Sequence, residues 1–218
     1  MDFDKLIRFL TELKENNHKP WFDTNRQTYD DLRNQWIEFT EKLIHEIGKF
    51  DEGIALLEPK NCIFRINKDV RFSKDKLPYK TNFGINLNPG GKKAEFMGYY
   101  FHVEPNSIFF AAGSYMPMPA TLAAIRQEID YNADELLKII NAKTFKQYFG
   151  KLEGDKLTRP PKGYDDSNGM IEYIKLKHII AVRNFKPEEL KKSDIIKEFG
   201  KTAKAAKPLL NFLRRAIE

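Results

Sequence analysis

The stretch FGINLNPGGKKAEFMGYYFHVEPNSIFFAAG, residues 83–113, decides the fold. Apolar residues recur at every second position in three runs within it, at residues 83–87, 96–103 and 108–113. A period of two is typical of half-buried strands, whose successive side chains point to opposite faces. The turn-forming stretches NPGG and EPNS separate the three runs. Because short turns join consecutive strands, the stretch predicts an antiparallel sheet.

Two further runs extend this predicted sheet. In residues 62–67, Phe64 and Ile66 would face one side of a strand and Arg65 the other. Residues 178–185 are rich in β-branched side chains, which fit a pleated surface. We therefore expect about five strands.

Helical periodicity surrounds the sheet on both sides. Apolar residues recur every three or four positions from Phe3 to Leu13, with Asp2 available as N-cap, and again from Tyr29 to Ile47. Further helices are predicted at residues 120–130, 133–140 and 144–149, from Pro187, and from Ser193 to the end, where Pro208 either kinks the helix or begins another.

These elements predict a single α+β domain over residues 1–218, a mainly antiparallel sheet enclosed by N-terminal and C-terminal helices. A chain of 218 residues buries roughly 70% of the surface that it exposes when unfolded, so it forms a core without disulfide staples. The expected parts are a helical part at 1–50, a sheet core at about 60–115 plus 178–185, and helical parts at 118–150 and 187–218.

Several classes of protein are disfavoured by what the sequence lacks. The single cysteine, Cys62, excludes an intrachain disulfide and a cysteine-rich zinc site, and its apolar neighbours predict burial. The sequence contains no P-loop, GxGxxG, HExxH or GxSxG motif, and its four histidines show no metal-ligand spacing. We therefore expect no cofactor and no metal site.

The N-terminus and the hydropathy pattern bear on location. The opening residues, MDFD, are acidic and begin an amphipathic pattern, which does not resemble a signal peptide. No uncharged run approaches 18 residues, the length that a membrane-spanning helix needs. The sequence predicts a soluble, cytoplasmic protein without a membrane partner, and it does not indicate an oligomeric state.

Positive charge is concentrated in residues 63–80, called here the basic segment. It holds six cations against two acids, Asp69 and Asp75, so it supplies four of the formal net charge of +6. Two interpretations stay open. The cations pair with acids of the same chain on a solvated face, or they form an anion pocket in which Arg65 and Arg71 offer bidentate donors and Ser73 and Tyr79 offer hydroxyls.

A second candidate region lies on the predicted strand at 96–103. Gly98, Tyr100 and His102 share one face at a period of two, and this face is more polar than a plain core face. His102 is either a hydrogen-bonded structural histidine or an acid–base group, and both interpretations stay open. No catalytic residue is assigned. The candidate ligand-binding residues are Arg65, Lys68, Arg71, Ser73, Lys74, Tyr79, Lys80, Tyr100 and His102.

Three blocks resemble a family of uncharacterised bacterial and fungal proteins, domain of unknown function 2461. They are Asn16-Asn17 with Trp21-Phe22 and Arg26-x-x-Tyr29, the run from Phe64 to Thr81, and Gly98 to Pro105 followed by Gly113 and Pro117 to Arg126. The later Arg159-x-Pro161-Lys162-Gly163-Tyr164 also fits, so the resemblance covers nearly the whole chain. Asn168-Gly169 stands where the family is expected to have a His-Pro pair, so no role of that histidine is carried over. The resemblance implies no activity.

The sequence supports three hypotheses about function. The first is binding of a small anionic, phosphorylated ligand at a basic sheet face, with turnover of that ligand left open. The second is a nucleic-acid-binding module that uses the same basic patch and stacks bases on Tyr79, Tyr99 or Tyr100. The modest net charge and the lack of a binding motif count against the second. The third is a protein-interaction domain.

Overall fold

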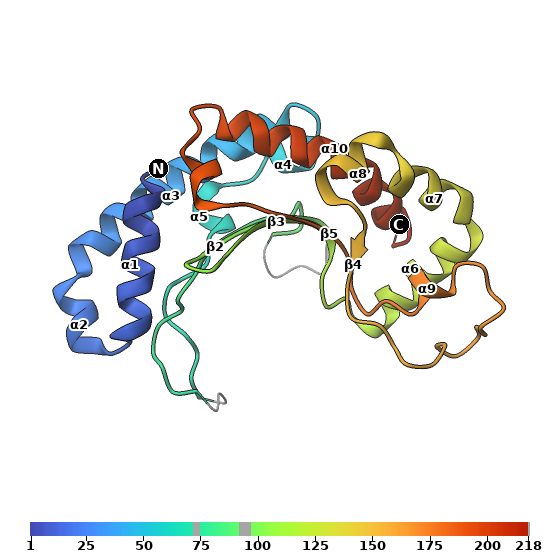
Figure 1. Cartoon of the computed structure of the whole chain (residues 1–218), viewed down its shortest axis with the longest axis horizontal. Helices are drawn as coiled ribbons and strands as arrows, with labels where there is room; N and C mark the ends of the chain where they lie inside the picture. Colours follow the sequence, from blue (N-terminus) through green and yellow to red (C-terminus); the bar gives the residue numbers. More distant parts are fainter. Residues whose placement is uncertain (72–74, 92–96, 218) are drawn as a thin grey trace.

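The computed structural model of the chain describes residues 1–71, 75–91 and 97–217. Its centre is a five-stranded antiparallel sheet with the strand order β1-β2-β3-β5-β4 (Figure 1). The strands are β1 (Phe83–Leu87), β2 (Gly98–Glu104), β3 (Ser107–Ser114), β4 (Leu152–Glu153) and β5 (Ile179–Asn184). The predicted α+β class, with helices at both termini, is confirmed.

Helices precede the sheet, connect its strands and follow it. They are α1 (Phe3–Glu15), α2 (Lys19–Thr24), α3 (Arg26–Gly48), α4 (Glu52–Ala55), α5 (Pro59–Cys62), α6 (Pro119–Tyr131), α7 (Ala133–Asn141), α8 (Lys143–Phe149), α9 (Ile171–Ile174), the 3-10 helix η1 (Pro187–Lys191) and α10 (Ile195–Arg215). The side chain of Asp2 caps α1 by accepting a hydrogen bond from the backbone N–H of Lys5, as the sequence predicts. Within the described residues, no helix has the length and apolar character needed to cross a membrane.

One face of the sheet carries the main core. Trp36 of α3 stacks on Phe101 of β2 with ring centroids 5.6 Å apart, and Phe101 lies 4.6 Å from Phe199 of α10. Phe110 of β3 also stacks on Phe199, at 5.7 Å. All four side chains are buried. Burial of their apolar surface stabilises the fold by about 25 cal/mol per Å². This aromatic layer fixes α3 and α10 on one side of the sheet.

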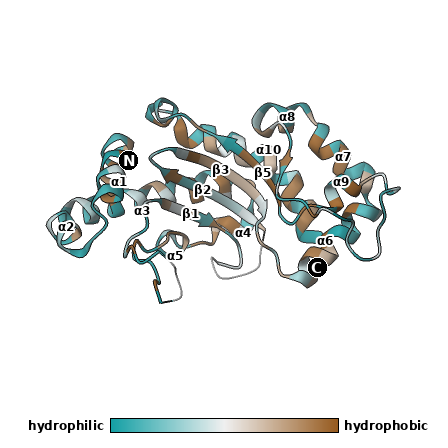
Figure 2. Ribbon diagram, turned by 60° about the horizontal axis from the view of Figure 1, so that its bottom comes forward, coloured by the Kyte–Doolittle hydropathy of each residue, from teal (hydrophilic) through white to brown (hydrophobic). Residues whose placement is uncertain are grey.

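The other face of the sheet is left uncovered by the described elements. In Figure 1 the long helices α3 and α10 lie on one side of the strands, while α1 and α2 at one end and α6 and α9 at the other extend past the opposite side. Figure 2 shows the same strands from that opposite side, where they are open to view. The molecule is therefore an arch with a concave sheet face, and this face positions the candidate site.

The prediction of a strand through Phe64 is wrong. The chain there leaves α5 and runs as an irregular segment that touches β1 through one isolated bridge, from Ile63 to Ile85. It then folds back on itself, because the N–H of Lys68 donates to the carbonyl of Pro78 and the N–H of Lys80 donates to the carbonyl of Ile66, both at 2.8 Å.

The fifth strand is instead β4, which pairs Leu152 with Ala181 of β5. A strand of two residues is too short to show a period of two in the sequence. Pro208 lies inside α10, and the helix continues through it. Pro208 therefore does not begin a separate helix. Trp21 lies in a separate short helix, α2, which precedes α3. Phe96, the first residue of one predicted strand, lies outside the described residues.

Candidate ligand-binding cavity on the open sheet face

A cavity of about 710 Å³ occupies the concave face of the sheet. Strands β1, β2, β3 and β5 form its floor, and Phe64 and Tyr115 stand at its sides. The lining residues with polar or aromatic side chains are Phe64, Asn86, Asn88, Tyr99, Tyr100, His102, Phe109, Tyr115 and Glu153. The lining is mainly apolar and aromatic, with a few polar groups, which is the usual make-up of a small-molecule site.

Strand register brings the floor residues together. Asn86, Tyr100, Ala111 and Val182 are successive neighbours across β1, β2, β3 and β5. In the next row, Gly84 is paired with His102, and His102 with Phe109. Because side chains alternate between the two faces, this register sends one set into the core and the other into the cavity.

Small residues give the cavity its depth. A Cβ atom at Gly84 would lie 2.8 Å from the hydroxyl oxygen of Tyr100 and 3.2 Å from Cδ2 of Phe64. Glycine therefore leaves room for the Tyr100 ring to lean across β1. Ala111, in the middle of the floor, keeps the space above it open.

Aromatic rings hold the polar groups of the floor in place. The imidazole of His102 stacks on Phe109 with centroids 4.8 Å apart and planes 15° apart. Tyr100 lies 5.9 Å from Phe109 and meets Phe64 edge-on at 6.3 Å. These distances are in the range of favourable aromatic pairs, so the rings stabilise one another's orientation.

Tyr100, His102 and Glu104 form a connected polar chain along β2. The hydroxyl oxygen of Tyr100 lies 3.0 Å from Nδ1 of His102, and Nε2 of His102 lies 3.5 Å from Oε2 of Glu104. The hydroxyl of Thr81 donates to Oε1 of Glu104 at 2.9 Å. A neutral imidazole has one donor and one acceptor nitrogen. Both imidazole nitrogens have a hydrogen-bonding partner when Tyr100 donates to Nδ1 and the Nε2–H faces the Glu104 carboxylate.

The protonation states of Tyr100 and His102 follow from their surroundings. Burial lowers the pKa of His102 below its ordinary value, and hydrogen bonding and charge from Glu104 act against that shift. Burial, together with the negative charge of Glu104, raises the pKa of Tyr100 to about 12. At neutral pH Tyr100 therefore keeps its proton, and burial favours the neutral form of His102.

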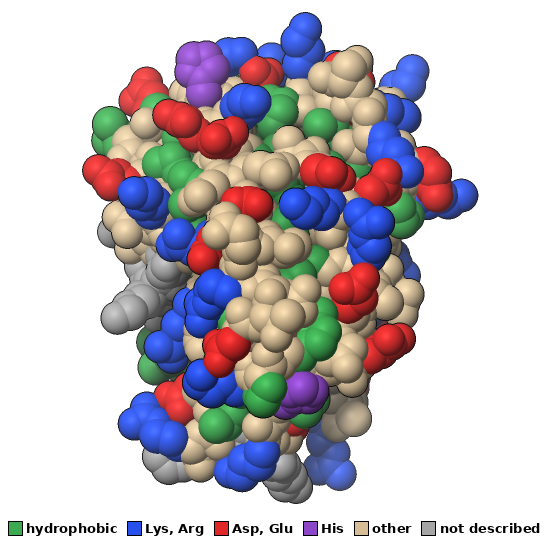
Figure 3. All heavy atoms as spheres, turned by 90° about the vertical axis from the view of Figure 1, so that its left-hand side faces the viewer, with side chains coloured by type: hydrophobic (Ala, Val, Ile, Leu, Met, Phe, Trp, Pro, Cys, Tyr) green, Lys and Arg blue, Asp and Glu red, His purple; other side chains and the backbone are tan. Residues whose placement is uncertain are grey.

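The basic segment supplies fewer open cations than its composition indicates. Arg71 donates from Nε and Nη2 to the two carboxylate oxygens of Asp69 at 2.9 and 2.7 Å, and Lys68 pairs with Asp75 at 2.8 Å. Figure 3 shows Lys and Arg side chains interspersed with Asp and Glu on the side of the molecule that carries α1 and α2. Pairing within the same segment is the first of the two interpretations drawn from the sequence.

The remaining predicted site residues lie in different places. Tyr79 is buried, and its ring stacks on Phe22 at 4.0 Å, so it packs against α2. Arg65 is exposed, whereas Nζ of Lys80 lies 5.3 Å from the ring centroid of the cavity residue Phe64. Ser73 and Lys74 lie outside the described residues. The structure thus places Lys80 over Phe64, which also meets Tyr100, and it places Tyr79 elsewhere.

Sequence reasoning missed most of the cavity wall. The sequence predicts only strands at the positions of Asn86, Phe109 and Val182. These residues alternate with core positions on three different strands and line the cavity. The signal for Asn86 and Phe109 is a polar or aromatic residue at the off-core position of a run, and the aliphatic Val182 gives no such signal. It takes the register between strands to show that these positions meet.

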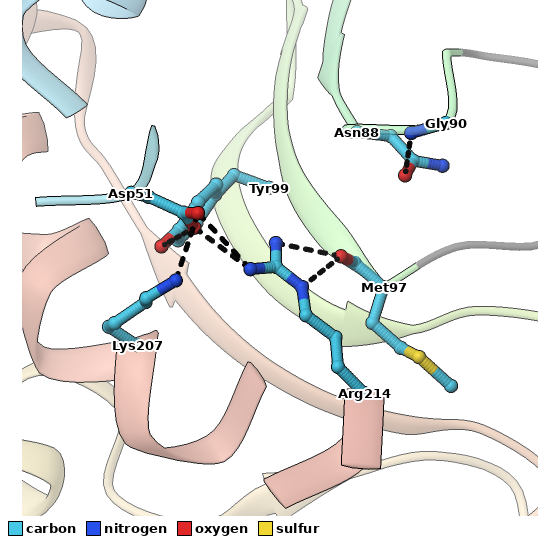
Figure 4. A network of polar contacts seen from close by, with 7 residues as sticks. All are labelled: Asp51, Asn88, Gly90, Met97, Tyr99, Lys207 and Arg214. Atoms are coloured by element: carbon cyan, nitrogen blue, oxygen red, sulfur yellow. Dashed lines mark hydrogen bonds and ion pairs between the residues drawn. The ribbon is translucent and has the colours of Figure 1, made fainter. Parts of the chain in front are cut away.

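A second polar network lies on the helix-covered side of the sheet (Figure 4). Buried Asp51 accepts a hydrogen bond from the Tyr99 hydroxyl at 3.0 Å and pairs with Lys207 at 2.9 Å and Arg214 at 3.2 Å. Arg214 also donates to the carbonyl of Met97, at 3.0 and 3.2 Å. This network ties the C-terminal part of α10 to the start of β2, and we interpret it as structural.

The burial of Cys62 agrees with the prediction from its apolar neighbours. His45 is exposed on α3. Over the described ranges, no group of three or more His, Cys, Asp and Glu side chains is arranged to hold a metal ion.

Comparison with known proteins places the chain in one group. A family model described as "Conserved hypothetical protein (DUF2461)" matches residues 5–212. No curated protein and no solved structure matches the chain.

Proposed function

Because the chain belongs to the DUF2461 family of conserved hypothetical proteins, whose description states no activity, we propose a function from the cavity itself. The protein binds a small phosphorylated molecule that carries a planar ring. The observation that carries this proposal is the aromatic cavity of about 710 Å³ with Lys80 beside its wall residue Phe64.

The rings of the cavity favour a planar ligand. Tyr100, Phe109 and Tyr115 line a space whose floor also carries Asn86, His102 and small or aliphatic side chains. An inserted ring stacks against such faces in the offset or edge-on geometry that aromatic pairs prefer. Asn86 adds a side-chain amide, which both donates and accepts hydrogen bonds at the edge of a heterocycle.

The position of Lys80 favours a phosphate on that ligand. Its ammonium group lies over Phe64, at the boundary between the cavity and the basic segment. A lysine offers three donors and a full positive charge to phosphate oxygens, and such charge-assisted bonds contribute about 1.5–3 kcal/mol each. Arg71 and Lys68 of the basic segment are paired with Asp69 and Asp75.

The size of the cavity and the pairing of the cations favour a small ligand over a nucleic acid. Small-molecule sites enclose roughly 300–1,000 Å³, and this cavity falls inside that range. A single-stranded nucleic acid also stacks on aromatic side chains, but it needs a continuous positive groove along its backbone. Acids of the basic segment neutralise two of the cations that such a groove requires.

Calorimetric titration with four probes tests the proposal. The probes are adenosine monophosphate, adenosine, ribose 5-phosphate and a single-stranded oligonucleotide. We expect the first to bind most tightly, because it alone presents one ring and one phosphate at a size that fits. Tighter binding of the oligonucleotide, with a steep loss of affinity as salt rises, supports the nucleic-acid alternative instead.

Two pairs of variants locate the site. Lys80→Ala should weaken adenosine monophosphate binding roughly 10- to 100-fold, whereas Arg71→Ala, which removes an exposed and already paired cation, should change it by about twofold or less. Val182→Trp fills the middle of the floor, and Asn184→Trp is its control on the same face of β5. Equal losses within either pair, or no binding of any probe, contradict the proposal.

A cytoplasmic location is part of the same proposal. Phosphorylated small molecules carry charges that keep them from crossing a bilayer, so a binder of such molecules is useful where they are made. Fractionation of cells that express the protein tests this, and recovery with the membrane or outside the cell contradicts it.

A further inference from the structure

We propose that the cavity is catalytic, and that Tyr100, His102 and Glu104 relay a proton while water hydrolyses the phosphate ester of the bound molecule. This inference rests on the proposed function, because it needs the phosphorylated ligand in the same cavity. It goes further by assigning a reaction class and a role to each of three residues.

The order of groups in the relay is the first argument. A carboxylate faces one nitrogen of an imidazole, and the other nitrogen faces a hydroxyl, at 3.5 and 3.0 Å. This order lets an imidazole accept a proton from the hydroxyl while the carboxylate stabilises the imidazolium that forms. Here the hydroxyl belongs to a tyrosine, and it ends in a cavity instead of the core.

The place where the relay ends is the second argument. The Tyr100 hydroxyl and Cδ2 of Phe64 both lie close to the same point above Gly84, at 2.8 and 3.2 Å. Lys80 lies over the same Phe64 ring. In the proposed complex, the phosphate bound by Lys80 beside Phe64 lies next to the hydroxyl of Tyr100. Holding a phosphate and a proton-transfer group together is what general acid–base catalysis requires.

The support around the relay is the third argument. Phe109 stacks on the His102 ring, and Thr81 donates to the carboxylate oxygen of Glu104 that does not face His102. Phe109 also lies 5.9 Å from the Tyr100 ring, so each of the three groups has a neighbour that does not take part in proton transfer. A reactive constellation needs such support to keep its geometry.

In the proposed step, the relay takes up one proton from water and returns it to the leaving group. Water gives a proton to the oxygen of Tyr100 as the Tyr100 proton moves to Nδ1 of His102, and the water oxygen bonds to phosphorus. The ester P–O bond breaks, and its electron pair stays on the leaving oxygen. The proton then returns from Nδ1 through Tyr100 to that oxygen. Phosphate ester and water become alcohol and inorganic phosphate, and the relay regains its starting state.

The relay requires His102 to be neutral at the start, which fixes the pH dependence. Among the residues that the structure describes, the titratable groups facing His102 are Tyr100 and Glu104 from its own strand. The neighbouring strands place Phe109 and Gly84 beside it, and neither carries a charge. Protonated His102 has no acceptor at Nδ1. Hydrolysis should therefore fall as the pH drops through the pKa of His102, which burial keeps below its ordinary value.

The test measures release of inorganic phosphate from adenosine monophosphate and of nitrophenol from p-nitrophenyl phosphate, with binding of adenosine monophosphate measured separately. Tyr100→Phe should keep binding within about threefold and lose hydrolysis by at least about 100-fold, the usual scale of acid–base catalysis. Tyr131→Phe, at an exposed tyrosine of α6 outside the cavity, should leave both unchanged. The loss should be smaller for p-nitrophenyl phosphate, because nitrophenolate leaves without taking up a proton.

Glu104 acts through His102, so its variant needs a different readout. Glu104 raises the pKa of His102, and removing that charge lowers this pKa further. Glu104→Gln should therefore move the acidic limb of the pH–rate profile to lower pH and reduce the plateau rate. A purely structural role reduces activity without moving the limb.

Failure of this inference is distinct from failure of the proposed function. If adenosine monophosphate binds but neither substrate is hydrolysed, or if Tyr100→Phe hydrolyses at the wild-type rate, the relay is not catalytic and the binding function stands. If adenosine monophosphate does not bind, the proposed function is wrong, and the relay loses its substrate with it.

Discussion

The side-chain amide of Asn17 makes two hydrogen bonds with the backbone of Tyr79, 62 residues away along the chain. It donates to the carbonyl oxygen and accepts from the N–H, both at 3.0 Å. Tyr79 also stacks on Phe22, so this point joins the link between α1 and α2 to the base of the basic segment. The segment is therefore anchored at a fixed position, and Lys80, the next residue, is placed by it.

Asn17→Ala should release this anchor. Asn17 is buried, so the change leaves a donor and an acceptor of Tyr79 without partners, at a cost of about 1–3 kcal/mol in the free energy of unfolding. Hydrogen exchange at the Tyr79 amide should accelerate. Asn61→Ala, at an exposed asparagine, serves as the control. Unchanged protection of the Tyr79 amide in the Asn17 variant contradicts the anchoring role.

Gly84→Ala should disturb the floor of the cavity. The new Cβ lies too close to the Tyr100 hydroxyl, so the ring must move and its hydrogen bond with His102 breaks. Overpacking of this kind costs about 1–3 kcal/mol, measurable by urea denaturation. A Cβ at Gly169 meets nothing within 4 Å, so Gly169→Ala is the matched control. Equal stability of the two variants shows that the floor tolerates a methyl group.

Asp51 should make stability depend on acidic pH. Burial acts to raise its pKa, but hydrogen bonds from Lys207 and Arg214 outweigh burial and hold this pKa below its ordinary value. Its contribution is thus present above the pKa of the unfolded chain and is lost as pH falls through the folded pKa. Asp51→Asn should cost about 3–5 kcal/mol at pH 7 and progressively less at acidic pH, relative to wild type.

Denaturation curves between pH 7 and pH 2.5 check this expectation. Glu38→Gln, at an exposed position on α3, controls for general loss of negative charge. A constant gap between wild type and Asp51→Asn over this range shows that Asp51 is not the source of the pH dependence.

His45→Ala should leave stability within about 0.5 kcal/mol of wild type, as expected for a surface change. His45 is exposed on α3, on the side away from the stripe that includes Trp36 and Leu43. Leu43→Ala removes a fully buried side chain two positions away and should cost about 2–5 kcal/mol. Thermal unfolding of the pair compares the two faces, and similar losses mean that the exposed face of α3 also packs.

Periodicity predicted the fold where runs were long enough to show it. The strands around Ile85, Phe101, Phe110 and Val182 and the helix through Trp36 and Leu43 follow from their own spacing. The run at Phe64 has the same period of two, but its backbone pairs within its own segment instead of joining the sheet. Alternation predicts an extended backbone, and it does not indicate which neighbour that backbone finds.

The candidate site was predictable only in part, and for a related reason. Tyr100 and His102 share a strand, so their common face follows from the sequence. Phe109 and Asn86 join them through the register of three strands, which no local pattern contains. The pairing of Arg71 with Asp69 also depends on side-chain conformation, so a count of cations overstated the charge available to a ligand.

The two edges of the sheet have a consequence for association between copies of the chain. An exposed strand edge is a template on which another chain adds a strand, and long flat edges lead to aggregation. Here one edge is β4, only two residues long, and along the other, β1 is met by the bridge from Ile63 to Ile85. The concave face is thus open to a ligand while the sheet offers little room for edge-to-edge growth into fibrils.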